Sequence, residues 1–214
     1  MKVWGYFRSS AAFRVRIALA IKGLDPEQLY VHLRKGEQRA PDYLARNPLG
    51  LVPTLEDGAA TITQSLAICE YLDETHPKPA FLPADAAARA RVRSLAYTIA
   101  CDIHPINNLR VLQYLTKTLK VDKAAHDQWY RHWIAVGFEG LEQLLGDGKA
   151  GRFCHGDVPT LADICLVPQV FNAKRFYSDE ELTVYPRIMA IFANCLAQPA
   201  FQKALPEHQP DFEP

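Results

Sequence analysis

The sequence predicts an α/β domain followed by an all-helical domain. Up to about residue 80, stretches with the alternating pattern of strands are interspersed with stretches of helical periodicity. A proline-rich stretch follows, and beyond it apolar residues recur at three- and four-residue spacing with little strand-like alternation. We therefore expect one domain over residues 1–80 and a second over residues 86–214.

The strands and helices of the first domain are predicted from its hydrophobic periodicity and its turn residues. Strands are predicted at 3–7, 28–33, 52–56 and 61–63, and helices at 11–22, 40–46 and 65–75. Gly23 ends the first of these helices, and Asp57-Gly58 marks a turn between the last two strands. The order strand, helix, strand, helix, strand, strand, helix produces a mixed sheet and is typical of a thioredoxin-like domain.

The second domain begins after a linker. Proline has no amide donor and clashes with the preceding turn, so helix formation is interrupted at Pro77, Pro79 and Pro83. Helical periodicity then covers 86–119, 124–145, 161–176 and 188–197. Thr160 and Asp163 have the spacing of a capping box at the start of the third of these helices, which indicates a stabilising cap without chemistry.

Charge and composition exclude several classes of partner. The 214 residues carry 24 Lys and Arg against 24 Asp and Glu, so no global field draws the chain to nucleic acid or to a membrane. The chain starts directly in a strand pattern, and no run reaches ~18 apolar residues, so we expect a cytoplasmic protein. The five cysteines are widely spaced among apolar neighbours and predict reduced thiols. No metal-ligand spacing is present, so no metal site is expected.

The stretch YFRSSAAFRVRIALAIKG at residues 6–23 places two serines where the first strand gives way to the first helix. The amides and the dipole of a helix start favour an anion there, and a serine hydroxyl can donate to a thiolate. No cysteine is present in this stretch, so it supplies no thiol of its own. The alternative is that Ser9 or Ser10 only caps the helix.

Several motifs, in the same order along nearly the whole chain, resemble one family. They are Arg8-Ser9-Ser10 with Ala11-Ala12-Phe13-Arg14-Val15-Arg16, Asn47-Pro48, Val52-Pro53-Thr54-Leu55, Gln64-Ser65, Ile103-His104-Pro105, Ala162-Asp163-Ile164-Cys165, Arg175-Phe176 and Gln209-Pro210-Asp211. Together they resemble the zeta-class glutathione transferases, which include maleylacetoacetate and maleylpyruvate isomerases. Ala11 stands where the family usually has cysteine, and Phe13 where it often has tryptophan.

The resemblance implies the glutathione transferase architecture, a homodimer, and glutathione as the cofactor that brings the missing sulfur. The implied reaction is the cis–trans isomerisation of a maleyl keto acid to its fumaryl isomer in the breakdown of aromatic compounds. Ala11 and Arg110 depart from the maleylacetoacetate-type pattern, which favours maleylpyruvate as the substrate. The alternatives are maleylacetoacetate, a transferase reaction on α-haloacids, and a glutathione-binding structural protein without catalysis.

The resemblance assigns the thiol and the cysteinyl part of glutathione to two turns of the first domain. Ser9 or Ser10 would contact the thiolate at the first helix. Val52 would expose its backbone beside a cis peptide bond to Pro53, so that an extended peptide can pair with it.

The carboxylates of glutathione are assigned to two further places. Ser65 and Gln64 open the helix after the hairpin and would take the γ-glutamyl carboxylate, with a simple helix cap as the alternative. Gln38 matches a family position near the glycyl end, with a solvated loop glutamine as the alternative.

The second substrate, a small dicarboxylic diketo acid, is expected between the two domains. A guanidinium can bind a carboxylate at two points and keeps its charge when desolvated, so Arg8, Arg110 and Arg175 are candidate catalytic and substrate-binding residues. His104 and Asn108 are four residues apart on a predicted helix and would line the same cleft. The alternatives are surface arginines and a structural histidine near a helix end.

Overall fold

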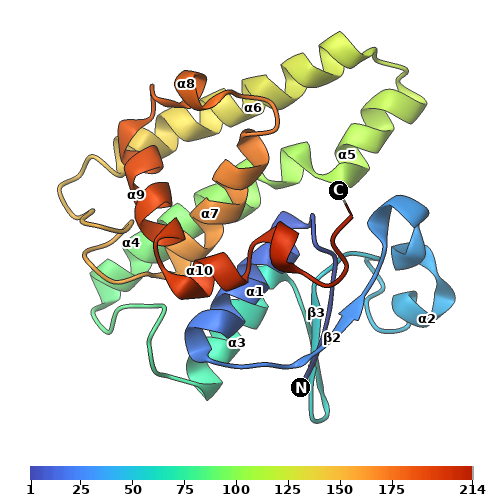
Figure 1. Ribbon diagram of the computed structural model, residues 1–214, viewed down its shortest axis with the longest axis horizontal. Coiled ribbons are helices and arrows are strands. Elements are labelled where there is room, and N and C mark those ends of the chain that lie inside the picture. The colour runs from blue at the N-terminus through green and yellow to red at the C-terminus, as the bar shows by residue number, and fades with distance from the viewer. Residues whose placement is uncertain (214) are drawn as a thin grey trace. The chain divides into compact units, whose positions relative to one another are not determined.

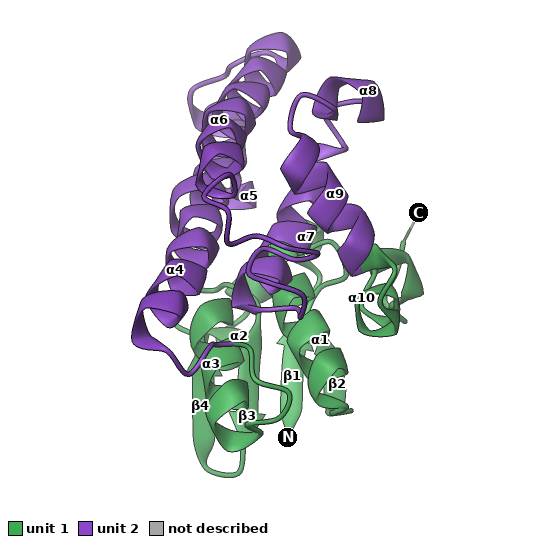
Figure 2. Ribbon diagram, turned by 90° about the vertical axis from the view of Figure 1, so that its left-hand side faces the viewer, with its two compact units in different colours: residues 1–81, 196–214 green, residues 82–195 purple. Residues whose placement is uncertain are grey.

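The computed structural model describes residues 1–213, which divide into two units (Figures 1 and 2). The first unit combines Met1–Phe81 with the chain from Leu196 onward, and the second unit is Leu82–Cys195. The first boundary falls in the proline-rich linker. The end of the chain, which we expected within the second domain, groups with the first unit instead.

The first unit is built on a four-stranded mixed sheet. Its strands are β1 (Lys2–Gly5), β2 (Glu27–Tyr30), β3 (Thr54–Asp57) and β4 (Ala60–Thr63), in the order β2-β1-β3-β4. Strand β1 runs parallel to β2 and antiparallel to β3. Strands β3 and β4 form a hairpin around Gly58, whose φ of 58° suits glycine. The predicted mixed sheet with one hairpin is confirmed.

The helices of the first unit follow the predicted order. They are α1 (Ser10–Lys22), α2 (Pro41–Leu44) and α3 (Ser65–Thr75), with 3-10 turns at Leu33–Lys35, Glu37–Arg39 and Pro206–His208. Helix α1 ends at Gly23, which has the left-handed φ of 68° expected of a C-terminal glycine. Strand β2 stops at Tyr30 rather than at residue 33, because the His32 side chain turns the chain by accepting from the Lys35 amide. Helix α2 is also shorter than the predicted 40–46.

Helix α1 is buried along most of its length. It contacts both α3 and α10 (Pro199–Lys203), and Phe13, Val15 and Ile17 are almost completely inaccessible. A helix covered by two other helices needs no polar stripe, which explains why its sequence is apolar nearly throughout.

The C-terminal segment completes the first unit. The Nε of Arg16 on α1 donates to the carbonyl oxygen of Ala204 at 3.0 Å. Further along the segment, the Asp211 carboxylate accepts from the Phe7 amide at 2.9 Å. The segment therefore holds both α1 and the turn that leads from β1 into it.

The second unit is helical, as predicted. Its helices are α4 (Ala86–Tyr97), α5 (Leu109–Gln113), α6 (Lys123–Leu144), α7 (Leu161–Ala173), α8 (Asp179–Leu182) and α9 (Pro186–Leu196), with π-helical turns at Thr98–Ile103 and Tyr114–Thr118 and a 3-10 turn at Pro105–Asn107. Helix α7 is buried over almost its whole length and contacts α4. Among the helices of residues 1–213, none has the length and apolar character needed to cross a bilayer.

The single helix that periodicity predicted over 86–119 does not form. The helical path breaks at Pro105, which has no amide donor, and Asn108 is extended with φ −68° and ψ 150°. The Asn108 side chain then caps α5 by accepting from the Arg110 amide at 3.2 Å. Apolar spacing continues across the break, so periodicity alone did not reveal it.

The predicted capping box at the start of α7 is present. The fully buried Asp163 carboxylate accepts from the Thr160 amide and from the Cys154 amide, both at 2.8 Å. Burial raises the pKa of Asp163, and these donors oppose part of that shift. Asp163 is thus a structural anchor between α7 and the loop before it.

Candidate functional site

The turn between β1 and α1 carries the first predicted site residues. Arg8 lies in the turn, Ser9 is the N-cap of α1, and Ser10 is the first helical residue and is buried. Within residues 1–213 the Arg8 guanidinium forms no hydrogen bond or ion pair. It is therefore available to a ligand.

The Ser9 hydroxyl can cap the helix and donate to an anion at the same time. It accepts from the Ala12 amide at 3.2 Å. A hydroxyl has one proton and two lone pairs, so the cap occupies a lone pair and leaves the proton free. No acidic side chain lies in the first turn of α1, so the positive end of the helix dipole is not neutralised there. The two roles, which the sequence presented as alternatives, are compatible.

The loop before β3 presents unpaired backbone at Val52. Its peptide bond to Pro53 is cis, as predicted. Neither the amide nor the carbonyl of Val52 hydrogen-bonds to another described residue, so both can pair with an extended peptide. Tyr43 and Asn47, both buried, donate to the Leu51 carbonyl at 2.6 and 2.7 Å and fix this loop.

The start of α3 combines open backbone amides with a buried charge. Gln64 has φ 71°, which is rare for a residue with a side chain, and no side chain of the described chain caps the helix. Ser65 is buried, and its hydroxyl oxygen accepts from the Nη1 of Arg14 at 3.2 Å. The first-turn amides and the Ser65 hydroxyl suit an anion such as a carboxylate.

Gln38 lies half-buried in the 3-10 turn Glu37–Arg39. Its Nε2 donates to the Leu33 carbonyl at 3.3 Å, while its Oε1 is buried without a partner among the residues described. Its contact with the glycyl end of a peptide stays a prediction.

In the second unit, His104 and Asn108 lie beside each other although no regular helix joins them. The Asn108 Nδ2 is 3.4 Å from the His104 Nε2. The Asn108 oxygen accepts from the Arg110 amide, so the Asn108 amide group is the donor toward His104 Nε2. The Arg110 side chain is exposed and makes no hydrogen bond or ion pair in the part of the chain described.

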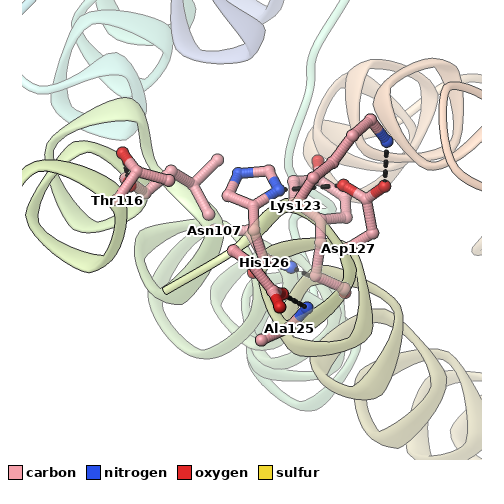
Figure 3. Close-up of polar contacts among 9 residues, drawn as sticks. Asn107, Thr116, Lys123, Ala125, His126 and Asp127 are labelled. Carbon is pink, nitrogen blue, oxygen red and sulfur yellow. Dashed lines mark hydrogen bonds and ion pairs between the residues drawn. The ribbon is translucent and has the colours of Figure 1, made fainter. Parts of the chain in front are cut away.

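Arg175 lies in a basic pocket of the second unit. The pocket has a volume of about 490 Å³ and is lined by Lys123, His126, Asp127, Arg131, Arg175 and Phe176. Asp127 pairs with both Lys123 and His126 (Figure 3), and these contacts lower the pKa of Asp127. Arg131 pairs with Glu181. Arg175 donates to the Asn172 side chain at 3.2 Å and has no carboxylate partner within residues 1–213, so it is free to bind a ligand carboxylate.

Sequence reasoning found Arg175 but missed the cations around it. Lys123, His126 and Arg131 lie on α6, far from Arg175 in the chain, so only the fold brings them together. Arg110 does not line this pocket. Arg14 was also passed over, although a charge inside an almost continuous apolar run was a signal that could have found it.

Four of the protein's five thiols are buried and are poor candidates for the chemistry, while Cys101 is exposed. Cys154 and Cys195 are buried, and burial raises the pKa of both thiols. No group of three His, Cys, Asp or Glu among the described residues could hold a metal ion. The free proton of Ser9, the unpaired Val52 backbone and the anion site at Ser65 fit a bound thiol peptide instead.

Comparison with known proteins identifies similar chains. The family models described as "Glutathione S-transferase, N-terminal domain" and "Glutathione S-transferase, C-terminal domain" match residues 1–74 and 127–194. A probable maleylacetoacetate isomerase of Vibrio cholerae is 52% identical over 211 residues, covering 98% of this chain and 97% of the relative. A maleylpyruvate isomerase of a Ralstonia species is 51% identical over 212 residues, covering 99% of each.

Solved structures agree with these matches. The fold is similar to the holo structure of a maleyl pyruvate isomerase, a bacterial zeta-class glutathione S-transferase, with a TM-score of 0.96, 50% identity and 100% coverage of both chains. A maleylacetoacetate isomerase from Methylobacterium extorquens AM1, solved with bound malonate and glutathione, gives a TM-score of 0.95 at 40% identity, again with 100% coverage of both.

Proposed function

This chain belongs to the zeta class of the glutathione S-transferase family and is a glutathione-dependent cis–trans isomerase of maleyl keto acids, and from that premise we propose which residues carry the reaction. When bound, glutathione supplies a thiolate that adds reversibly to the maleyl double bond, so that the bond can rotate and the thiol is returned unchanged. The protein holds the peptide, keeps its thiol ionised and orients a diacid. The observation that carries this proposal is a helix start with a free hydroxyl donor and no thiol of its own.

The first unit holds the peptide at separate points. Ser9 donates to the thiolate, and the backbone of Val52 pairs with the cysteinyl residue. Ser65 and the first-turn amides of α3 bind the γ-glutamyl carboxylate, with the Gln64 side chain beside them. Gln38 contacts the glycyl end.

Ser9 also sets the ionisation of the thiol. A hydrogen bond donated to the charged form lowers the pKa of a thiol, and the positive end of α1 acts in the same direction. Ser10 is buried behind it as the first residue of the helix, so we assign the thiolate contact to Ser9.

Arginines bind the carboxylates of a small dicarboxylic diketo acid. Arg8, Arg110 and Arg175 each lack a carboxylate partner within residues 1–213. A guanidinium binds a carboxylate at two points and remains charged. The same charge neutralises the oxygen on which negative charge develops. His104 and Asn108 supply polar contacts, and the malonate bound to one relative supports a diacid as ligand.

We favour maleylpyruvate over maleylacetoacetate. Maleylpyruvate is shorter by one methylene beyond the ketone, so its far carboxylate lies closer to the double bond. The methylene alone changes binding by only ~0.8 kcal/mol, so a charged contact placed to reach the nearer of the two carboxylate positions is a stronger discriminator. Arg110, exposed and unpaired among the described residues, is the group we assign to that contact.

The test is steady-state turnover of both diketo acids with and without glutathione. We expect strict dependence on glutathione, recovery of the peptide unchanged, and the higher kcat/KM for maleylpyruvate. Turnover in thiol-free buffer contradicts the proposal, and a higher kcat/KM for maleylacetoacetate assigns that substrate. Faster halide release from an α-haloacid makes the chain a transferase, and glutathione affinity without turnover makes it a binding protein.

We also propose that the chain acts as a homodimer. The second unit exposes large apolar side chains at Leu109, Tyr114 and Leu119, which suits contact with a second copy. The chain has a mass of 24.1 kDa, so light scattering should give twice that value. A monomer mass at concentrations that support full activity contradicts this proposal.

A further inference from the structure

A buried arginine of α1 has no counter-ion within residues 1–213. Arg14 is 2% exposed, between Phe13 and Val15, which are also buried. Its Nη1 donates to the Ser65 hydroxyl oxygen at 3.2 Å, while its Nε and Nη2 have no partner within residues 1–213. Buried guanidinium groups are normally paired, because an unpaired charge away from water is strongly destabilising. Arg14 therefore needs a compensating negative charge.

Arg16, two residues further along α1, shows the usual pattern. Its Nε, Nη1 and Nη2 donate to the carbonyl oxygens of Ala204, Tyr6 and Phe7 at 3.0, 3.4 and 3.0 Å. Burial lowers the pKa of Arg16 to about 10, and Asp211 opposes that shift. In helix α1, all three guanidinium nitrogens of Arg16 donate hydrogen bonds, whereas two of those of Arg14 have no partner within residues 1–213.

We propose that Arg14 is a positioning residue for the α-carboxylate of the γ-glutamyl group of glutathione, acting through the Ser65 hydroxyl. This inference rests on the proposed glutathione site at the start of α3. Because the Ser65 oxygen accepts from the guanidinium, its own proton is available to the carboxylate. A hydroxyl that accepts from a cation is a stronger donor, since the two hydrogen bonds polarise each other. The bound carboxylate in turn supplies the negative charge that Arg14 lacks.

The backbone at this position supports the same inference. Gln64 is held at φ 71°, and no side chain of the described chain caps α3. Such strained backbone persists only where its surroundings hold it, and it leaves the first-turn amides open beside Ser65. An anion bound there meets the amides, the Ser65 hydroxyl and, behind that hydroxyl, the charge of Arg14.

The test measures binding of two ligands by calorimetry. One is glutathione, and the other is γ-aminobutyryl-cysteinyl-glycine, which lacks only the α-carboxylate. Arg14→Gln should weaken glutathione binding by ~10- to 100-fold and leave the affinity for the analogue almost unchanged. Arg14→Lys should recover part of the loss, because it keeps the charge but not the planar geometry. In a Ser65→Ala background the further effect of Arg14→Gln should disappear.

Arg16→Gln is the matched control, since it makes the same change on the same helix. It removes backbone contacts and should affect both ligands equally. Equal losses for both ligands in Arg14→Gln show a structural role and overturn the proposal. If Arg14→Gln does not fold, Arg14→Lys carries the comparison, and an equal loss there overturns it too. Absence of glutathione binding by the unmodified chain overturns the proposed function itself.

Discussion

At the scale of single residues, the Ser9 hydroxyl links the stability of α1 to the chemistry. Its oxygen accepts from the Ala12 amide, which leaves its proton to donate to the thiolate of our proposal. The stability of α1 and the ionisation of the bound thiol therefore depend on different parts of one hydroxyl group. A substitution that keeps the acceptor of the helix cap but removes the donated proton therefore tests the two roles separately.

We expect Ser9→Ala to lose both roles. Loss of the cap should lower the free energy of unfolding by ~1 kcal/mol, and loss of the donor should raise the pKa of the bound thiol and reduce turnover at least ~tenfold. Ser9→Asp keeps an acceptor for the cap but has no proton to give at neutral pH, so it should regain stability without regaining turnover. Ultraviolet titration of the bound thiol and thermal unfolding check these outcomes, with Ser10→Ala as control. An unchanged thiol pKa in Ser9→Ala leaves Ser9 with the cap alone.

For Arg110 we expect a change in substrate binding. Arg110→Ala should raise KM for the diketo acid and lower kcat/KM by ~10- to 100-fold, because a charge-assisted contact to a carboxylate is lost. Arg110→Lys should recover part of this loss. Lys117, another exposed cation nearby in the chain, is the control, and Lys117→Ala should leave the kinetics unchanged. Unchanged kinetics in folded Arg110→Ala move the carboxylate site to Arg8 and Arg175.

At the scale of elements, one arginine joins α4 to the loop after α6. Arg91 donates to both oxygens of Asp147 at 2.6 and 2.7 Å and to the Cys154 carbonyl at 2.7 Å. The bond from Arg91 lowers the pKa of Asp147 to about 2. A carboxylate with a lowered pKa in the folded state stabilises the fold above its unfolded pKa, and this contribution is lost as pH falls through the folded value.

Asp147→Asn should therefore lower the melting temperature at neutral pH but not at acidic pH. The difference from the unmodified chain should stay constant down to about pH 5, where the unfolded carboxyl, with a pKa of about 4, begins to titrate. It should shrink between there and the folded pKa of about 2. Thermal unfolding of Asp147→Asn and of the unmodified chain over this pH range measures the difference in melting temperature. A difference that does not change with pH contradicts the assignment of the stability to this ion pair.

Most helices and strands could be predicted from local sequence signals, whereas features that depend on contacts between distant residues could not. Alternation, Gly23 and the Asp57-Gly58 turn were enough to predict the order of strands and helices along the first domain and its mixed sheet, because each signal acts over a few residues. The break at Pro105 was missed because apolar spacing runs on through it. At the site, Ser9 is readable from its place before a helix, whereas the bond from Arg14 to Ser65 joins residues 51 positions apart.

At the scale of the whole molecule, the first unit depends on both ends of the chain. The segment from Leu196 onward supplies α10, the Ala204 carbonyl bound by Arg16, and the Asp211 carboxylate bound to the Phe7 amide. Without it, the buried face of α1 that contacts α10 would meet water. The unit is therefore not a separable N-terminal domain.

Removal of the chain after Cys195 should abolish glutathione binding and stable folding of the first unit. The milder Asp211→Asn should cost about 1–3 kcal/mol of stability, because the Phe7 amide loses a charged acceptor. Calorimetry with glutathione and thermal unfolding measure both effects. Glutathione affinity that survives the truncation unchanged shows that residues 1–195 suffice for the site.

The contact between Phe7 and Asp211 spans 204 positions, and this has a consequence for synthesis on the ribosome. N-terminal domains commonly fold while the rest of the chain is still being translated. Here the β1–α1 turn emerges early, but the segment that holds it emerges after the second unit. Closing so long a loop is slow compared with forming local helices. A nascent chain stalled before Asp211 therefore has no finished Ser9 turn, so activity should appear only after the C-terminal segment has left the exit tunnel.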